Sequence, residues 1–187
     1  MEFVPTDIPE VVLIKPKIFG DSRGYFMESF RSDLFAEHVG KVNFIQDNES
    51  KSAYGVLRGL HYQLPPYGQA KLVRAITGRV LDVAVDIRKN SPTFGRNVTA
   101  ELSEENKHQL FIPSGFAHGF LVLSKVAVFS YKVDAPYTPD HERGIYYADP
   151  DLGIGWGLPD SEIRLSEKDR KWPLLVTSDG LRVTGDR

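Results

Sequence analysis

Residues 80–87 read Val-Leu-Asp-Val-Ala-Val-Asp-Ile, and their alternating pattern is the clearest indication of the fold class. Its side chains alternate between two sets. The apolar set is Leu81, Val83, Val85 and Ile87, and the other set is Asp82, Ala84 and Asp86. An alternation with period two places the two sets on opposite faces of a β-strand. We therefore predict a strand over residues 80–87, which begins after a tight turn at Gly78-Arg79.

The segments on both sides of this strand have the same character. We predict further strands over residues 11–19, 25–30, 44–48, 56–63, 72–77, 97–102, 109–112, 118–123 and 127–133. Three of these strands, 56–63, 72–77 and 80–87, follow one another at the spacing of β-hairpins. Short strands at roughly 8–12-residue intervals, separated by turn residues, are typical of an all-β sandwich or barrel. No β-α-β alternation is visible, which argues against an α/β fold.

Helices are expected to be few and short. The best candidate runs from Ser32 to Val39, with Ser32 as its N-cap and Gly40 as the residue that ends it. A further helical turn is predicted near residues 166–171, where Ser166-Glu-Lys-Asp169 is typical of a capped helix start. The chain contains no internal repeat and no linker, so we predict a single domain over residues 1–187.

Composition narrows the possible functions. The 187 residues are 41% hydrophobic and 26% charged, with a formal net charge of −2 and no run of like charges, so we expect no nucleic-acid or membrane partner. The chain has no cysteine, which excludes disulfides, thiolate nucleophiles and Cys-ligated metals. The first nine residues do not resemble a signal peptide, and no apolar stretch is long enough to span a membrane, so we expect a cytoplasmic protein.

Two of the five histidines lie in apolar strand contexts beside a glycine, namely His61 and His118. Along a strand, His61 shares one face with Gly59 and Gln63, and Arg58 faces the other side unless a bulge at Gly59 rotates it. From spacing alone, the more ordinary interpretation of His61 is a structural histidine with a hydrogen-bonded ring. Of the remaining three, His38, His108 and His141, the first two are expected at the surface.

Pro113-Ser-Gly-Phe-Ala-His118-Gly-Phe120 resembles the second motif of the cupins. The first cupin motif supplies His-x-His and a downstream Glu, but here the corresponding stretch reads His61-Tyr62-Gln63, followed by Lys71. A charged lysine donates hydrogen bonds and does not bind a metal ion. The resemblance therefore implies a cupin-type jelly-roll barrel whose metal site has been lost, and we expect no metal.

Other polar residues are ordinary when taken one at a time. Arg23 and Arg58 each lie beside a glycine and could hold phosphate oxygens, but a lone arginine at such a position is usually a surface residue. Lys71 taken alone is best interpreted as an exposed strand lysine. Tyr131 and Tyr137 could belong to the core or to the rim of a site.

Taken together, several segments resemble the dTDP-4-dehydrorhamnose 3,5-epimerase family, in order and over nearly the whole chain, from about Ile8 to Pro173. The segments are residues 20–30, 46–50, 55–63, 71–73, 82–88, 91–95, 112–123, 131–132 and 165–169. One departure is Trp156-Gly157, where the family often has Trp-Pro, and it puts only the local C-terminal loop in question.

The resemblance implies a homodimer that acts on a dTDP-sugar without any cofactor. The expected reaction inverts C3 and C5 of dTDP-4-dehydro-6-deoxy-D-glucose to give dTDP-4-dehydro-L-rhamnose, in rhamnose biosynthesis. The implied catalytic residues are His61 as general base, Asp169 as the carboxylate that orients it, Lys71 as the cation beside the ketone oxygen, and Tyr131 as the acid on the opposite face. The implied substrate-binding residues are Arg23, Phe26, Glu28, Gln46, Asn48, Arg58, Gln63, His118, Tyr137, Glu142 and Lys168.

The chemistry of this reaction agrees with these residue types. A proton next to a ketone is removed by a positioned base, and an imidazole has an unperturbed pKa of about 6.5, close to neutral pH. An ammonium group that faces the developing oxyanion stabilises the transition state more than the ground state. Inversion then requires a proton from the other face, for which Tyr131 is suited.

Three alternatives remain open at the level of sequence. A metal-dependent cupin enzyme would need more ligands than this chain offers, and elemental analysis would reveal it. A non-catalytic sugar-binding cupin would bind the ligand and leave its protons in place. A relative that inverts only C3 or C5, or that shifts the ketone along the ring, is the nearest alternative, because the same four catalytic residue types are compatible with it.

Overall fold

The structure is a computed structural model, and it describes residues 1–175. Within these residues the chain forms 13 strands, one α-helix and three short 3₁₀ helices. The elements are β1 (Glu2–Pro5), β2 (Val12–Lys15), β3 (Ile18–Asp21), β4 (Gly24–Met27), α1 (Ser32–His38), β5 (Gln46–Ala53), β6 (Leu57–Gln63), β7 (Lys71–Thr77), β8 (Arg79–Asp86), β9 (Asn97–Ser103), β10 (Gln109–Ile112), β11 (Phe116–Val122), β12 (Val126–Val133), η1 (Pro139–His141), β13 (Glu142–Gly144), η2 (Asp160–Glu162) and η3 (Asp169–Lys171).

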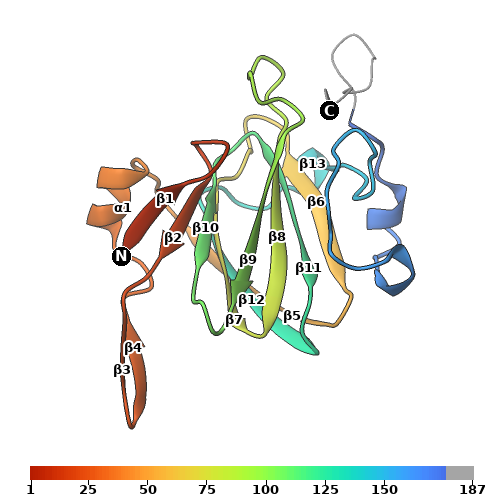
Figure 1. The fold of residues 1–187 in the computed structure, drawn as a ribbon. Helices are drawn as coiled ribbons and strands as arrows, with labels where there is room; N and C mark the ends of the chain where they lie inside the picture. The colour runs from red at the N-terminus through yellow and green to blue at the C-terminus, as the bar shows by residue number, and fades with distance from the viewer. Residues whose placement is uncertain (176–187) are drawn as a thin grey trace.

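Two antiparallel sheets face each other and form the body of the molecule (Figure 1). The first sheet has the order β1-β2-β10-β7-β12-β5, and the second has the order β13-β6-β11-β8-β9. A separate two-stranded hairpin, β3-β4, projects from this body. The arrangement confirms the predicted all-β jelly-roll barrel with a few short helices.

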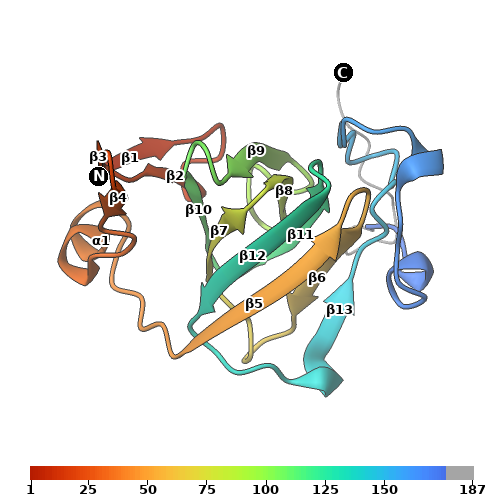
Figure 2. The ribbon, with the colours of Figure 1, turned by 90° about the horizontal axis from the view of Figure 1, so that it is seen from below.

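The strand over residues 80–87 shows which face of the second sheet lies inside the barrel. Val80 and Ala84 belong to the core cluster between the sheets, so Asp82 and Asp86 also lie on the inner side, and both are fully buried. The opposite, apolar set packs against the C-terminal part of the chain, where Val83 and Val85 join a second cluster with Trp156. Figure 2 shows this C-terminal segment against the outside of the barrel. The β8 strand is therefore buried on both faces.

The predicted hairpin pairing of three successive strands is wrong. β6 and β8 belong to the second sheet and β7 to the first, so none of these three strands pairs with the next. The turn at Gly78-Arg79 passes from one sheet to the other. Gly78 has a positive φ of 73°, and a Cβ there would lie 2.1 Å from the carbonyl oxygen of Val126, so the crossing requires glycine.

The short helix α1 covers the outer face of the first sheet, where Phe35 packs edge-on against Phe111 with ring centroids 5.2 Å apart. Its N-cap is Arg31, which makes no capping hydrogen bond with its side chain, so the prediction of Ser32 as N-cap is wrong by one residue. The predicted stop is confirmed, because Gly40 has a φ of 130° and its amide donates to the carbonyl of Phe35.

Candidate functional site

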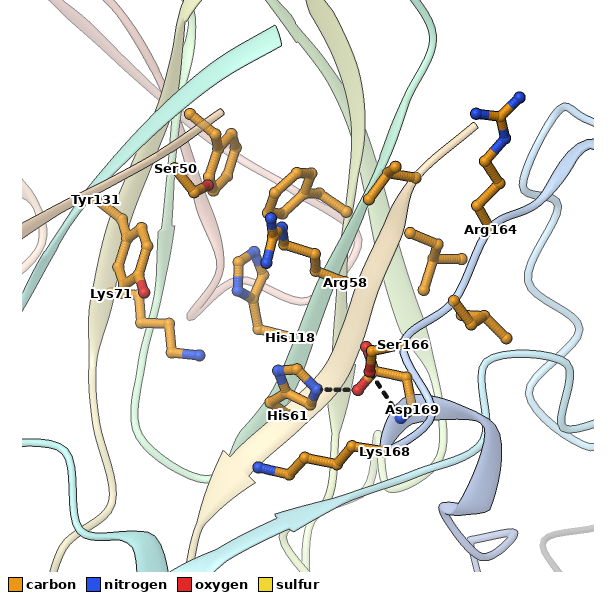
Figure 3. A pocket seen from close by; sticks show the side chains of 15 residues that line it. Ser50, Arg58, His61, Lys71, His118, Tyr131, Arg164, Ser166, Lys168 and Asp169 are labelled. Carbon is orange, nitrogen blue, oxygen red and sulfur yellow. Dashed lines mark hydrogen bonds and ion pairs between the residues drawn. The ribbon is translucent and has the colours of Figure 1, made fainter. Parts of the chain in front are cut away.

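A cavity of about 470 Å³ lies between the two sheets, and side chains from both of them line it (Figure 3). The strands β5, β7 and β12 of the first sheet contribute one wall, β6 and β11 of the second sheet contribute the other, and the segment 164–169 closes one side. The lining residues are Ser50, Val56, Leu57, Arg58, His61, Lys71, His118, Phe120, Phe129, Tyr131, Arg164, Leu165, Ser166, Lys168 and Asp169. All four implied catalytic residues are among them.

His61 and Asp169 form a close pair although they are 108 residues apart in the chain. The Nε2 atom of His61 lies 2.5 Å from Oδ1 of Asp169, and the Asp169 residue is only 4% exposed. Burial alone would raise the pKa of Asp169, but hydrogen bonds with His61, Ser166 and Trp172 outweigh it, so this pKa is lowered and the carboxylate stays ionised. The other ring nitrogen of His61, Nδ1, faces the cavity.

Lys71 extends across the cavity from the opposite sheet. It is half-buried rather than exposed, and burial lowers its pKa to about 8, although the negative charges of Asp82 and Glu142 act in the other direction. The ordinary interpretation of this lysine, an exposed strand residue, is therefore wrong. Figure 3 shows its amino group pointing toward the two histidines of the opposite wall.

Tyr131 lies on β12, in the wall that faces His61 (Figure 3). Burial raises the pKa of its phenol, while the nearby charge of Arg58 lowers it to a smaller extent. The hydroxyl is therefore protonated at neutral pH and can act as a proton donor from the wall opposite the imidazole.

Arg58 reaches the same cavity because of an irregularity in β6. His118 pairs with His61, and Phe120 pairs with Arg58, so two residues of β6 face one residue of β11, Gly119. This bulge answers the question that the sequence left open, since it turns Arg58 to the side of His61. A Cβ on Gly59, whose φ is 141°, would lie 2.5 Å from the Cα of Gly119.

His118 forms a hydrogen-bonded pair with a buried carboxylate. Its Nε2 atom lies 2.9 Å from Oδ2 of Asp82, which is fully buried on the inner face of β8. Burial lowers the pKa of His118, and the nearby charges of Lys71 and His61 also contribute, whereas Asp82 raises it. The balance favours a neutral imidazole that can hydrogen-bond a ligand oxygen.

Three of the implied substrate contacts are linked to one another, and one of them, Lys168, lines the cavity. The hydroxyl of Tyr137 donates to Oε2 of Glu142 at 2.5 Å, and the ammonium group of Lys168 forms an ion pair with the same oxygen. Gln63 lies nearby on β6, but its amide group is occupied by backbone atoms: it donates to the carbonyls of Tyr67 and Pro136 and accepts from the amide of Thr138.

Like Tyr137, Glu142 and Gln63, the remaining implied contacts are not among the residues that line the cavity within residues 1–175 of this protomer. Gln46 and Asn48 hydrogen-bond to each other on β5 at 2.7 Å. Arg23 and Phe26 lie on the β3-β4 hairpin, where Arg23 pairs with Asp21 at 2.6 Å and Phe26 is 65% exposed. Glu28 follows the hairpin and lies 3.8 Å from Arg31.

The structure also places residues at the site that sequence reasoning did not select. They are Ser50, Asp82, Arg164, Ser166 as a contact of Asp169, and Trp172. Asp82 had a signal, because it falls on the face opposite the apolar set of its strand, although that face was not known to be the inner one. Ser166 had a signal too, because Ser166-Glu-Lys-Asp169 is typical of a capped helix start, and its Oγ accepts from the amide of Asp169 at 3.0 Å. Ser50, Arg164 and Trp172 had no signal of their own. Within residues 1–175, no three His, Asp or Glu residues come together as a metal-binding group.

Comparison with known proteins agrees with this geometry. Residues 5–177 match the family model described as dTDP-4-dehydrorhamnose 3,5-epimerase. This chain belongs to that epimerase family. It is 56% identical to the dTDP-4-dehydrorhamnose 3,5-epimerase of Shigella flexneri, over 96% of this chain and 98% of the relative, and 54% identical to that of Pseudomonas aeruginosa, over 92% and 94%.

Solved structures of epimerases share the fold. A Legionella pneumophila epimerase in complex with dTDP-4-keto-L-rhamnose has a TM-score of 0.90 and 48% identity, with 99% of each chain covered. A 3′-monoepimerase from Streptomyces bikiniensis, in complex with dTDP-quinovose, has a TM-score of 0.84 and 36% identity, over 91% of this chain and 86% of that one. The expected epimerase fold is thus confirmed by experimentally determined relatives.

Proposed function

We propose that this chain inverts C3 and C5 of dTDP-4-dehydro-6-deoxy-D-glucose to give dTDP-4-dehydro-L-rhamnose. The observation that carries the proposal is the placement of the His61–Asp169 pair on one wall of the cavity, with Lys71 and Tyr131 on the other. Family membership and the ligand in the Legionella relative, dTDP-4-keto-L-rhamnose, support the same substrate class.

His61 is the proposed general base. Its Nδ1 atom takes the proton from the carbon beside the C4 ketone, and the electron pair moves onto the ketone oxygen to form an enolate. Asp169, on the other ring nitrogen, stabilises the imidazolium that results. Lys71 neutralises the oxyanion, and loss of such a donor typically lowers the rate by about 100–1,000-fold.

Tyr131 completes the inversion. Its hydroxyl returns a proton to the same carbon from the opposite face, and the enolate electron pair forms the new C–H bond. Each inversion leaves His61 protonated and Tyr131 deprotonated, so one proton passes back between them through solvent before the next inversion. The two carbons beside the ketone can react in turn by the same steps.

Arg58 and His118 are proposed to hold the diphosphate or the sugar, because both line the cavity next to the catalytic pair. A guanidinium group binds phosphate oxygens in a forked geometry, and a neutral imidazole adds one hydrogen bond. Gln46, Asn48, Lys168 and Tyr137 remain proposed contacts of the nucleotide, and Glu142 remains a proposed further contact of the substrate. Gln63, also an implied substrate contact, supports the loop that carries Tyr137, because its side chain hydrogen-bonds the backbone of Pro136 and Thr138.

We further propose a homodimer in which the β3-β4 hairpin of one protomer reaches the cavity of the other. The hairpin carries three large aromatic side chains that are 52–65% exposed, namely Phe19, Tyr25 and Phe26. A group of exposed aromatic residues on a projecting hairpin is typical of a protein interface. This arrangement would bring Arg23, Phe26 and Glu28 to a substrate that they do not reach within their own protomer.

Several broader expectations remain proposals of the same kind. We propose that residues 1–187 form a single cytoplasmic epimerase domain that needs no metal and no cofactor and binds no nucleic acid. Among residues 1–175, no helix has the length and apolar character needed to cross a membrane.

Product analysis tests the proposed reaction. The protein is incubated with dTDP-4-dehydro-6-deoxy-D-glucose, and the proton couplings of the sugar ring are followed by NMR. Inversion at both C3 and C5 is expected. A substrate that is bound and left unchanged would show that the chain is a sugar-binding protein instead.

A single-carbon epimerase is the second candidate. The observation that favours it is the similarity to the Streptomyces bikiniensis 3′-monoepimerase, which shares this fold at 36% identity. Inversion at one carbon, with the other configuration retained through many turnovers, would select this function over the double epimerisation.

A further inference from the structure

The segment that carries Asp169 lies outside both sheets. It consists of the three-residue helix η3 and its flanks, which backbone hydrogen bonds anchor to the barrel at both ends, at Arg164 with Gly55 and Leu57 and from the amide of Tyr146 to the carbonyl of Pro173 at 2.8 Å. Between these anchors, among residues 1–175, the backbone of residues 165–172 makes no hydrogen bond to the strands. The carboxylate of Asp169 must nevertheless keep one fixed orientation to hydrogen-bond with the His61 ring. Side-chain contacts must therefore supply the positioning that the backbone does not.

Trp172 makes such contacts with both members of the catalytic pair. Its Nε1 atom donates a hydrogen bond to Oδ1 of Asp169 at 3.2 Å, and this is the same oxygen that lies 2.5 Å from Nε2 of His61. The indole ring also lies edge-on to the imidazole, with centroids 6.2 Å apart and an interplanar angle of 69°.

Gly144 provides the place where the indole sits. A Cβ at this position would lie 2.3–2.5 Å from three atoms of the Trp172 ring, so the ring rests directly on the backbone of β13. Gly144 is also the residue that pairs with His61 between β13 and β6. The indole is thus seated on the strand residue opposite the imidazole, and this contact fixes its distance from the catalytic pair.

We propose that Trp172 is a positioning residue for the epimerase reaction, whose indole N–H fixes the Asp169 carboxylate in the orientation that holds His61. The inference rests on the proposed function, and it adds a residue to which no role has been given. An indole nitrogen only donates, so it always favours the ionised carboxylate. Because a hydrogen bond to a charged group restricts its rotation, the oxygen stays aimed at the imidazole. Trp172 does not line the cavity, and no contact with substrate is implied.

The test replaces the indole and keeps its shape as far as possible. Trp172→Phe leaves an aromatic ring beside Gly144 and removes the N–H donor. We expect kcat to fall by roughly 10-fold, as for the loss of one hydrogen bond to a charged group, with KM within about two-fold of wild type. The matched control is Trp156→Phe, which removes the only other tryptophan; its N–H donates to the carbonyl of Tyr147 at 2.9 Å, away from the cavity. The control should leave kcat unchanged.

A double-mutant cycle separates positioning from simple structural damage. In an Asp169→Asn background, Trp172→Phe should have almost no further effect on kcat, because the group that it positions has already been changed. An equal loss of kcat in both backgrounds, or no loss in either, would overturn the proposal. Gly144→Ala offers an independent route, because it displaces the indole while retaining Trp172, and it should reproduce the loss of kcat.

A measurement that does not depend on turnover keeps this inference distinct from the proposed function. In ¹⁵N-detected spectra of the histidine rings, Trp172→Phe should shift the His61 signals and Trp156→Phe should leave them in place. If wild type does not turn over the sugar nucleotide, the proposed function fails, but these spectra still test the contact. Unshifted His61 signals in Trp172→Phe would refute it.

Discussion

At the scale of single residues, Lys71 shows how strongly a barrel interior changes an ordinary side chain. The amino group lies among two histidines and a tyrosine, and burial lowers its pKa to about 8. A lysine with this pKa is still mostly charged at neutral pH, but a modest rise in pH neutralises it. The role proposed for Lys71 requires the ammonium form, so loss of its proton at higher pH should lower the rate of the reaction.

We therefore predict that kcat/KM falls as the pH rises through about 8, the pKa of Lys71 in the free protein. Only the protonated lysine carries the charge that stabilises the oxyanion, so kcat/KM is lost above the pKa of Lys71 and not below it. In Lys71→Arg, whose residual activity rests on a guanidinium that stays charged, this alkaline limb should move to higher pH. A limb that stays near pH 8 in that variant would assign it to another group.

Tyr131 should separate the two halves of an inversion. Tyr131→Phe removes the proposed proton donor and leaves the base intact, so exchange of substrate protons with solvent should persist while inversion at one carbon or both slows. The ratio of exchange to inversion, measured by NMR in D₂O, checks this. A ratio unchanged from wild type would rule out Tyr131 as the acid.

Single residues were the hardest features to interpret from the sequence. Judged by spacing alone, His61 would have been a structural histidine and Lys71 a surface lysine, because burial depends on which strands face each other across the barrel. Their roles were suggested by resemblance to a family, and the structure now brings both into one cavity. Trp172 had no signal at all, because its position beside Asp169 depends on packing against Gly144, which is 28 residues earlier in the chain.

At the scale of elements, the close approach of β6 and β11 determines what the second sheet offers to the cavity. Gly59 and Gly119 face each other at the bulge, and there is no room for a side chain at either position. The bulge places Arg58 and His61 on one side, although three positions along a regular strand would place them on opposite sides.

Gly59→Ala should therefore lower both stability and activity. The added methyl group would overlap Gly119, and a non-glycine residue at a φ of 141° is strained, so we expect a loss of about 3 kcal/mol or more in the free energy of unfolding. Urea denaturation measures it. Gly153→Ala is the control. Gly153 also has a positive φ, 57°, but among residues 1–175 no atom lies within 4 Å of a Cβ placed there, so we expect a loss of only about 1 kcal/mol. Similar losses at both positions would contradict the proposed steric role of Gly59.

The strands themselves were largely predictable, and their partners were not. Alternation and turn residues located nine of the eleven strands in the two sheets, including β8, and missed β1 and β13. The strand expected over residues 44–48 is β5, which runs from Gln46 to Ala53. The same local pattern carries no information about which sheet a strand joins, so β6, β7 and β8 were expected to be hairpin neighbours and are not. The segment around Asp169 has no periodicity, and its position is set by contacts with distant strands.

At the scale of the whole molecule, the β3-β4 hairpin is the feature that a single protomer does not explain. It holds implied substrate contacts and exposed aromatic residues, yet it contributes nothing to the cavity lining of its own protomer. A two-fold symmetric dimer, in which the same surfaces meet twice, would explain both properties.

Complementation between two inactive variants tests this arrangement. One variant is His61→Asn, and the other carries Arg23→Ala and Phe26→Ala on the hairpin. If each site combines one protomer's cavity with the other's hairpin, mixed dimers contain one intact site, and an equal mixture should recover about a quarter of the wild-type activity after subunit exchange. Each variant alone serves as the control. A mixture no more active than the two variants apart would place the hairpin residues outside the reaction.

Solvent exchange at C3 and C5 of dTDP-4-dehydro-6-deoxy-D-glucose in D₂O, followed by proton NMR with wild type and with His61→Asn, tests the proton abstraction by His61 itself. If the His61 imidazole removes the protons beside the ketone, wild type will introduce deuterium at both carbons and the variant will show only the background rate. Near-normal exchange in the variant would contradict the assignment of His61 as the base.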